Sequence, residues 1–490
     1  MRRTFPSTFY SRSLAVCAVI VLSCTLSASA QSFTSLASLN GTNGFVPSSL
    51  IQGTDGNFYG TASRGGASNQ GTVFQVTPAG VITAIYSFCA LPSCADGEQP
   101  QGSLVLGSDG NFYGTATGGG AQQKGTVFKI TPGGTLTTIY NFCSLTNCTD
   151  GAFPNGGLVL ESDGNFYGTT QGVFSESPGT IFGITPTGTL TTLYNFCAKP
   201  DCADGTSPRA GLTRDRGETL FGTTPDGGTT ANGTVFRITL DGKFFKTLHS
   251  FCTGGASCPD GSFPMGPLTV GFDGNIYGTA GSGGANSNGA AFSLTPTGTY
   301  ALLYSFCPAA DCTDGSLPQS GLFQATDANF YGTALEGGFN GRGTLFRVSK
   351  AGVETRLHSF HVTDGAAPRT QVVQGTDGNV YGTTSNGGPR NKTICNNPPF
   401  GCGTVFRESV GKPFVKAVEL EGKVGDSIVI LGNALTGSTG VTFNGTTAIF
   451  TVVSDTEITA TVPSGATTGK IEVTTPTTLL VSNVKFEVLP

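Results

Sequence analysis

A seven-residue motif recurs along this chain of 490 residues at a nearly constant interval. DGNFYGT occupies residues 55–61 and returns unchanged at 109–115 and 163–169. Altered copies follow, and the glycine before the final threonine lies at Gly60, Gly114, Gly168, Gly222, Gly278, Gly332 and Gly382. Such a series indicates a repeat architecture, in which each unit is one supersecondary element that packs on its neighbours.

One unit, residues 102–142, contains four short runs of β-forming residues: SLVLG, NFYGTA, GTVFKIT and TLTTIYNF. Asp109-Gly110 separates the first two runs, Pro132-Gly133-Gly134 separates the last two, and a glycine-rich loop joins the middle pair. These are tight-turn sequences, and we expect the aspartate of the motif to cap its own turn. Four antiparallel strands in each of seven units predict an all-β fold, a seven-bladed β-propeller.

The order of the runs at the two ends of the repeats predicts a closed ring. The seventh copy ends at GTVFRES, residues 403–409, without a fourth run, whereas residues 33–39 supply a fourth-type run before the first copy. If both belong to one four-stranded blade, the first and last strands pair and no sheet edge is left open. We therefore predict that the N-terminal strand closes the propeller.

The N-terminus has the features of a secretory signal peptide. A basic segment precedes a short apolar run, Leu14 to Leu26, and Ala28-Ser29-Ala30 supplies small residues for cleavage. We interpret residues 1–30 as the signal peptide and expect the mature protein to be secreted or held at the cell surface. Cys24 offers an alternative, a lipid-anchor site. No later segment has the ~20 apolar residues needed to cross a bilayer.

The mature chain is acidic. Three of the 26 Lys and Arg residues lie in the signal peptide, so 23 basic residues face 31 acidic ones. This balance argues against nucleic acid and anionic membranes as partners. The expected partner is an unidentified extracellular ligand, a polysaccharide or a protein.

Twelve of the 14 cysteines follow the signal peptide, and they occur in close pairs. Their even number, short spacing and secreted context favour local disulfides, whereas a zinc site would need two such pairs together or histidines, of which the chain has three. We predict no metal site and no cofactor. The predicted disulfides are Cys89–Cys94, Cys143–Cys148, Cys197–Cys202, Cys252–Cys258, Cys307–Cys312 and Cys395–Cys402.

The repeat unit resembles the GloVer tandem repeats of bacterial extracellular proteins. The sequences DGNFYGTT, GTVFKITP and LTTLYNF carry the resemblance, which covers residues 33–409. The resemblance implies an extracellular repeat scaffold and no particular reaction.

The pattern changes after the seventh copy, because the last 78 or so residues contain no cysteine and no motif. Short runs such as SIVILG, GVTFNG and EITATVP alternate with turn residues, which is typical of a small β-sandwich. VGDSIVILGNAL, VTFNG and SDTEITATVP resemble an IPT/TIG domain, an immunoglobulin-like module. We therefore divide the chain into a signal peptide (1–30), a seven-bladed propeller (31–411) and an IPT/TIG-like β-sandwich (412–490).

Candidate binding residues lie between the repeats, where six stretches carry Asp-Gly close to the fourth run. The aspartates are Asp96, Asp150, Asp204, Asp260, Asp314 and Asp364. They could form turns or a repeated ligand site, but near-identical acids lack the two different carboxyl environments that glycoside hydrolysis needs. The enlarged last glycine-rich loop, 386–402, adds Arg390 and Lys392 as candidates. No residue is assigned a catalytic role.

The sequence therefore predicts a secreted, non-enzymatic binding protein whose propeller rim recognises cell-surface polysaccharide or protein. One alternative is an extracytoplasmic polysaccharide hydrolase or lyase, which an asymmetric cluster of carboxylates and an arginine in the central channel would indicate. The other alternative is a structural spacer or adhesin.

Overall fold

The computed structural model describes residues 1, 32–173, 178–215, 217–255, 257–389, 395 and 401–490. Residues 2–30 of the predicted signal peptide lie outside these residues. The described chain is all-β, and its helical segments are single 3₁₀ turns, η1 (Pro92–Cys94), η2 (Thr146–Cys148) and η3 (Pro200–Cys202). No helix in these ranges has the length and hydropathy required to span a bilayer.

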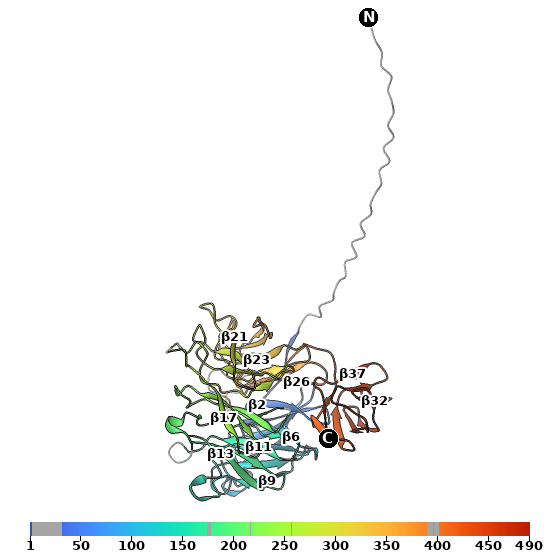
Figure 1. Cartoon of the computed structure of the whole chain (residues 1–490), viewed down its shortest axis with the longest axis horizontal. Helices are drawn as coiled ribbons and strands as arrows, with labels where there is room; N and C mark the ends of the chain where they lie inside the picture. Colours follow the sequence, from blue (N-terminus) through green and yellow to red (C-terminus); the bar gives the residue numbers. More distant parts are fainter. Residues whose placement is uncertain (2–31, 174–177, 216, 256, 390–394, 396–400) are drawn as a thin grey trace. The chain divides into compact units, whose positions relative to one another are not determined.

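Residues 33–408, here called the repeat region, form a series of four-stranded antiparallel sheets that resemble the blades of a β-propeller (Figure 1). In each sheet the strands pair in the order first, second, third, fourth, which confirms the predicted strand pattern of the unit. The strands of the sheets are β2 (Phe45–Gln52), β3 (Phe58–Arg64), β4 (Thr72–Val76) and β5 (Ile82–Ser87); β6 (Val105–Leu106), β7 (Phe112–Ala116), β8 (Thr126–Ile130) and β9 (Leu136–Asn141); β10 (Val159–Leu160), β11 (Phe166–Thr170), β12 (Thr180–Ile184) and β13 (Leu190–Asn195); β14 (Thr213–Arg214), β15 (Thr219–Thr224), β16 (Thr234–Thr239) and β17 (Phe245–Ser250); β18 (Thr269–Val270), β19 (Ile276–Ala280), β20 (Ala290–Leu294) and β21 (Tyr300–Ser305); β22 (Phe323–Gln324), β23 (Phe330–Ala334), β24 (Thr344–Val348) and β25 (Glu354–Ser359); and β26 (Val373–Gln374), β27 (Val380–Thr384), β28 (Thr404–Glu408) and β1 (Phe33–Ser38).

The motif makes the turn between the first and second strands. Asp55 accepts a hydrogen bond from the backbone N–H of Asn57 (3.1 Å) on one carboxylate oxygen, and from the Tyr59 hydroxyl (2.8 Å) on the other. Gly56 takes a φ of +78°, which glycine adopts readily. The same bonds recur at Asp109, Asp163, Asp273, Asp327 and Asp377. The predicted capping role of this aspartate is confirmed.

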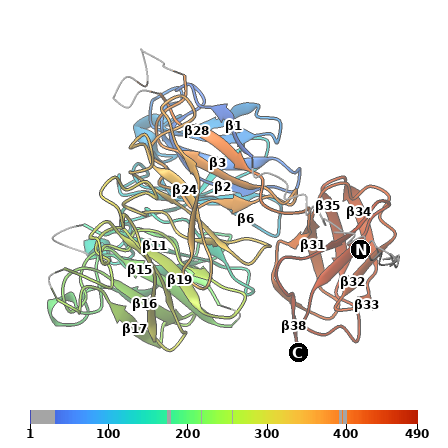
Figure 2. The same cartoon turned by 90° about the horizontal axis from the view of Figure 1, so that it is seen from above.

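The N-terminal strand completes the last sheet. β1 pairs antiparallel with β28, from Phe33 opposite Glu408 to Ser38 opposite Thr404. Figure 2 shows the two strands side by side, although they come from opposite ends of the repeat region. This pairing confirms the predicted partner of residues 33–39.

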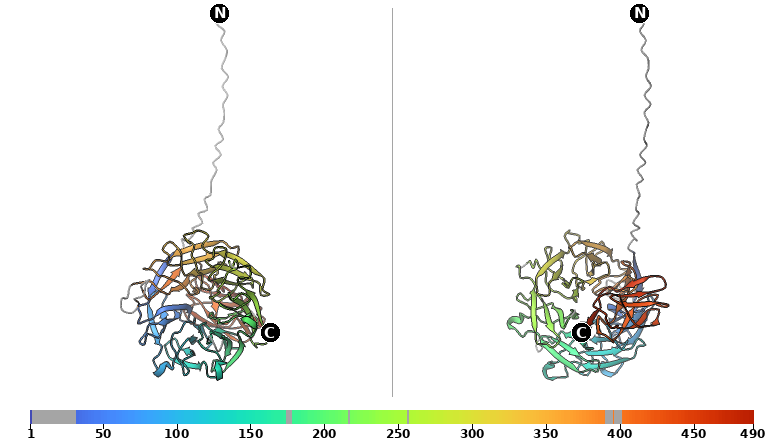
Figure 3. Two further views of the ribbon diagram at one scale, coloured as in Figure 1. Left: turned by 90° about the vertical axis from the view of Figure 1, so that its left-hand side faces the viewer. Right: turned by 45° about the vertical axis from the view of Figure 1, so that its right-hand side comes forward.

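Neighbouring sheets pack through aromatic side chains of their second strands. The Tyr59 ring lies 4.3 Å from the Phe112 ring of the following sheet, centroid to centroid. The last sheet contacts the first in the same way, because the rings of Tyr381 and Phe58 are 4.1 Å apart. The left view of Figure 3 shows the sheets following one another in sequence order. Every sheet therefore has a neighbour on both sides, the first and the last included.

Residues 412–490, here called the C-terminal module, form two further four-stranded sheets and a parallel strand pair. The sheets have the strand orders β29-β31-β35-β34 and β33-β32-β36-β37, and β30 pairs with β38. Ile430 and Ile458 of one sheet share an apolar core with Val441 and Val473 of the other. The strands are β29 (Lys416–Ala417), β30 (Glu421–Lys423), β31 (Ser427–Leu431), β32 (Gly440–Phe443), β33 (Thr446–Thr447), β34 (Phe450–Ser454), β35 (Glu457–Thr461), β36 (Ile471–Thr474), β37 (Leu479–Val481) and β38 (Glu487–Leu489).

Candidate functional site

Disulfide loops connect the fourth strand of a sheet to the first strand of the next. All six predicted disulfides are present, and five of them close these connections. The sixth, Cys395–Cys402, lies in the enlarged glycine-rich loop. Glycine-rich loops lie beside the disulfide loops, since Gly120 N–H donates to the Cys94 carbonyl and Gly338 N–H to the Cys312 carbonyl, both at 2.9 Å. We call this end of the repeat region, made of the disulfide loops and the glycine-rich loops, the disulfide face.

The predicted rim aspartates fasten the disulfide loops. Asp150 is fully buried, and its carboxylate accepts hydrogen bonds from the Tyr140 hydroxyl (2.8 Å) and from the backbone N–H groups of Ser144 (2.8 Å) and Leu145 (3.2 Å). Asp96 and Asp204 repeat this arrangement. Each of these carboxylates therefore ties its loop to the preceding fourth strand.

The other three predicted aspartates are held in a related way. Asp314 is buried and accepts from the Tyr304 hydroxyl (2.9 Å), whereas Asp260 and Asp364 are half-buried and meet histidines in place of tyrosine. His249 Nε2 lies 3.0 Å from Asp260 and His358 Nε2 lies 3.1 Å from Asp364. Burial lowers the pKa of His249, although the charge of Asp260 opposes this effect.

The geometry thus leaves almost no free carboxylate surface at three of the six predicted positions, whereas Asp260 and Asp364 stay partly exposed. Asp96, Asp150 and Asp204 are at most 1% exposed. A ligand role for the six aspartates stays a prediction, and Arg390 and Lys392 lie outside the described residues.

The disulfide face instead exposes apolar side chains, which the sequence analysis did not predict. Leu91 and Leu145 protrude from disulfide loops, and Phe339, 71% exposed, protrudes from a glycine-rich loop. The Arg356 guanidinium lies 3.8 Å from the centroid of the Phe339 ring, a cation–π geometry. The signal was present in the sequence, because a phenylalanine interrupts the polar loop EGGFNG.

The C-terminal module docks at the opposite end of the strands, where the Asp-Gly-Asn turns lie. Thr456 Oγ1 donates to the Thr54 carbonyl (2.7 Å) and Asn433 Nδ2 donates to Thr376 Oγ1 (2.7 Å). Thr54 and Thr376 both belong to such turns. These two hydrogen bonds therefore hold the module at the end of the repeat region opposite the disulfide face.

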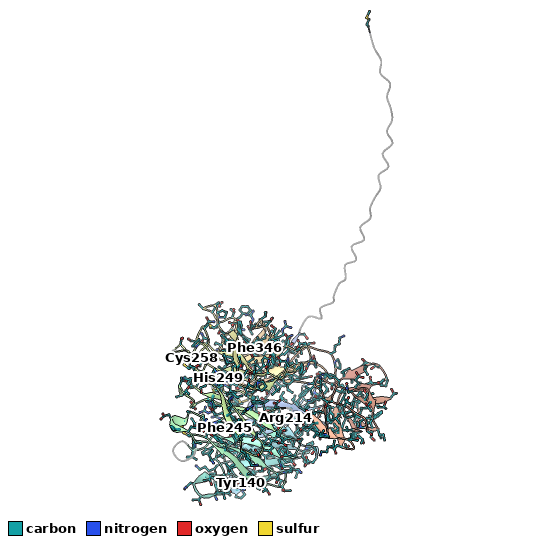
Figure 4. The ribbon with its side chains drawn as sticks, in the orientation of Figure 1. Tyr140, Arg214, Phe245, His249, Cys258 and Phe346 are labelled. Atoms are coloured by element: carbon teal, nitrogen blue, oxygen red, sulfur yellow. A yellow bond between two sulfur atoms is a disulfide. The ribbon has the colours of Figure 1, made fainter. Side chains whose placement is uncertain are left out.

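A charged cluster joins the module to the first strands of the repeat region. Arg214 Nη2 lies 2.9 Å from Glu421 Oε1, and Arg214 Nε lies 3.5 Å from Glu161 Oε2. Glu161 is 3% exposed; burial raises its pKa to about 8, a shift that the charge of Arg214 opposes and the charge of Glu421 supports. Figure 4 shows Arg214 between the repeat sheets and the C-terminal strands. The cluster pairs two carboxylates with one arginine, and the other repeats show no such arrangement among the residues that the structure describes.

Three cavities meet at Arg214. The first, of about 270 Å³, also contains the half-exposed ring of Phe272 and the amide of Gln371. The second, of about 270 Å³, contains Glu161 and Glu421. The third, of about 230 Å³, contains Lys416 and is otherwise largely apolar. Within the described ranges, no group of three or more His, Cys, Asp or Glu side chains could hold a metal ion.

This cluster was not predicted from the sequence. Glu161 stands at the position of the glycine that precedes the turn in other repeats, such as Gly53 and Gly107, and Arg214 stands at the position of Leu106. A comparison of the repeats position by position would have revealed these substitutions. Glu421 comes from the C-terminal module, and no repeat pattern could have placed it there.

Solved structures with a similar fold are distant in sequence. The extracellular domain of a hybrid two-component system from B. thetaiotaomicron is 12% identical with a TM-score of 0.50, over 91% of this chain and 53% of that chain. An oligogalacturonate lyase in complex with manganese is 12% identical with a TM-score of 0.45, over 78% of this chain and 90% of that chain. A chain of a nidogen/laminin complex is 15% identical with a TM-score of 0.37, over 60% of this chain and 90% of that chain. At this identity, the first similarity concerns the fold alone.

A comparison with curated protein sequences found no match. A family comparison, in contrast, found the Gloeobacter/Verrucomicrobia repeat in three overlapping segments, residues 21–218, 144–325 and 305–460. These segments include every copy of the motif and cover most of the chain. The chain belongs to the Gloeobacter/Verrucomicrobia repeat family.

Proposed function

We propose that the repeat region is a seven-bladed β-propeller and that the C-terminal module is an IPT/TIG-type immunoglobulin-like domain. The pairing of β1 with β28 and the contact of Tyr381 with Phe58 support a closed ring of blades. The two sheets around one core support the immunoglobulin-like assignment. With a signal peptide at residues 1–30, the domains are residues 31–411 and 412–490.

We further propose that the protein is a secreted, non-enzymatic binding protein that recognises a cell-surface polysaccharide or protein with its disulfide face. The observation that carries this proposal is the exposure of Leu91 and Leu145 on loops that disulfides and buried aspartates hold in place, and of Phe339 on a glycine-rich loop that is hydrogen-bonded to a disulfide loop. Loops that are already ordered lose little conformational entropy on binding. Exposed apolar side chains on such loops are typical of interaction sites. The six disulfides suit an oxidising, extracellular location.

The test is a binding screen of the mature protein against bacterial and plant polysaccharides and against cell-surface extracts. Every ligand found is then titrated against the triple variant Leu91→Ser, Leu145→Ser, Phe339→Ser. We expect binding at least about tenfold weaker, as for the loss of a few apolar contacts. The matched control is Val81→Ser with Val353→Ser, because these exposed valines lie in turns between third and fourth strands, at the other end of the sheets. Equal binding by the triple variant and the parent would contradict the proposal.

A polysaccharide hydrolase or lyase is the second candidate, and the Arg214 cluster favours it. Glu161, with a pKa of about 8, retains a proton at neutral pH, as a general acid must. Glu421 on the same arginine is a second carboxylate in a different environment. Oligosaccharide release that Glu161→Gln abolishes and the exposed-site control Glu336→Gln preserves would establish this function. Binding without any product would favour the non-enzymatic proposal.

A further inference from the structure

β29 places one lysine between the C-terminal module and the repeat region. Side chains alternate along a strand, so the residues on either side of Lys416 point away from it. Val415 and Ala417 are buried in the core of the module. Lys416 pairs with Leu431 of β31, and Leu431 belongs to an apolar cluster that includes Leu106 of the repeat region. Lys416 therefore faces the first strands of the repeat sheets.

The cavity that Lys416 lines has apolar walls. Its volume is about 230 Å³. The apolar lining residues are Ile51, Val105, Leu106, Val159, Leu160, Ala417, Val418, Leu420 and Leu431. Two other polar side chains line it, and both are already engaged: Gln52 exchanges two hydrogen bonds with Thr376, and Arg214 is paired with Glu161 and Glu421. None of the described residues that line this cavity is acidic.

The Lys416 ammonium has no hydrogen-bond or ion-pair partner among the described residues. Desolvation by the surrounding side chains lowers the pKa of Lys416 to about 8, and no neighbouring carboxylate offsets it. Four acidic residues, Glu161, Glu419, Glu421 and Asp426, line the adjoining cavity together with Arg214. An ammonium group among apolar side chains is stabilised most directly by an anion beside it.

We propose that this cavity, here called the Lys416 pocket, is a binding site for a small amphiphilic anion, a carboxylate on a short apolar body. The carboxylate would accept hydrogen bonds from Lys416 Nζ, and the apolar body would pack on Ile51, Leu106 and Leu160. The positive charge of Lys416 selects an anion, and no acidic residue among those that line the pocket would repel it. The volume of the pocket limits the apolar body of the ligand to a few carbon atoms. The acidic residues of the adjoining cavity disfavour a ligand with a second negative charge. This site is separate from the disulfide face, and it does not depend on the function proposed for that face.

The test compares three probes of equal chain length on the full mature protein by calorimetry at pH 6.5. Hexanoate carries the carboxylate, 1-hexanol lacks the charge and hexylamine reverses it. We expect hexanoate to bind with one-to-one stoichiometry, hexanol at least about tenfold more weakly, and hexylamine not at all, because a charge-assisted hydrogen bond is lost. Hexanoate binding should weaken as the pH rises above about 8, where the free lysine loses its proton.

Variants separate the pocket from other sites. Lys416→Met keeps the length of the side chain and removes the charge, so hexanoate should bind it at least about tenfold more weakly. Lys416→Arg should retain binding. Lys485→Met is the control, because Lys485 is an exposed lysine of a neighbouring cavity. Melting curves verify that each variant is folded. Undiminished hexanoate binding to a folded Lys416→Met, equal affinity for hexanol, or no hexanoate binding to the parent protein would overturn the proposal.

Discussion

The Thr383 hydroxyl donates a hydrogen bond of 2.9 Å to the carbonyl oxygen of Ser48, although 335 positions separate the two residues. Thr61 and Gly102 form the same bond at 2.9 Å between the first two sheets, and Thr169 and Ala210 form it at 2.9 Å further along. The contact that links successive sheets is thus repeated between the last sheet and the first. This equivalence supports the proposed closed ring of blades.

Deletion of residues 33–39 should destabilise the whole repeat region. The deletion removes the strand that pairs with β28 and exposes the edge of that strand to water. It also removes Phe33, whose ring stacks on His358 with centroids 3.5 Å apart. We expect the melting temperature to fall by at least about 5 °C, since several kcal/mol are lost from a protein of this size. Ser35→Ala, at an exposed position of the same strand, is the control. An unchanged melting temperature of the deletion variant would contradict closure by β1.

Much of the repeat region could be predicted because one local pattern is written many times. The Asp-Gly-Asn turns, the order of the strands, the six disulfides and the partner of β1 all follow from the spacing of short motifs. The aspartates of the disulfide loops were harder to interpret. Sequence alone does not reveal whether a carboxylate such as Asp150 turns outward or, as here, into its own loop.

Asp150→Asn should loosen its disulfide loop. The buried carboxylate accepts from one hydroxyl and two backbone N–H groups, and an asparagine would present an NH₂ group to some of these donors. We expect a loss of roughly 1–3 kcal/mol of unfolding free energy, the cost of leaving buried donors unsatisfied. Denaturant titration measures this loss.

The control for that experiment is Asp201→Asn, in the equivalent loop of the next repeat, because Asp201 is exposed. We expect Asp201→Asn to stay within about 0.5 kcal/mol of the parent. The same small effect in Asp150→Asn would show that its hydrogen bonds do not stabilise the loop.

The protein should be more stable at pH 5 than at pH 8. Burial raises the pKa of Glu408 to about 7, and one of its carboxylate oxygens is buried without a hydrogen-bond partner. Between an unfolded pKa of 4.5 and about 7, the folded chain binds more protons than the unfolded chain, so the free energy of unfolding falls as the pH rises. Glu161 and Glu354, with pKa values of about 8 and about 7, act in the same direction.

Glu408→Gln isolates one of these contributions. The substitution removes the titrating group and keeps its shape, so the decline in melting temperature from pH 5 to pH 8 should become smaller. Glu336→Gln, at an exposed position, should leave the pH profile of the parent unchanged. A profile for Glu408→Gln that superimposes on that of the parent would contradict the assignment of a buried, protonated Glu408.

The Arg214 cluster and the Lys416 pocket could not be predicted because two unrelated parts of the chain create them. Glu161 and Arg214 are single departures from the repeat pattern, and they acquire a common partner only when Glu421 docks beside them. Lys416 belongs to a strand of the C-terminal module in which its neighbours Val415 and Ala417 face the core, so the alternation of side chains indicates only that Lys416 points away from that core. Lys416 faces the repeat sheets only because the C-terminal module docks on them, and no local sequence pattern encodes that docking.

Lys416→Met should stabilise the ligand-free protein at neutral pH. The ammonium has apolar neighbours and no counter-charge, so an apolar side chain of similar length removes a desolvation cost, and we expect a gain of roughly 1–3 kcal/mol in unfolding free energy by denaturant titration.

The pH dependence of stability provides a second signature of the Lys416→Met substitution. Between about pH 8 and 10.5 the unfolded chain binds a proton that the folded chain has released, so the parent gains stability as the pH rises through this window, and Lys416→Met should lack that gain. Exposed Lys485→Met should change neither quantity. A Lys416→Met variant that is less stable than the parent would show that Lys416 has a stabilising partner. A variant that is more stable than the parent and no longer binds hexanoate would show that Lys416 serves ligand binding at the expense of stability.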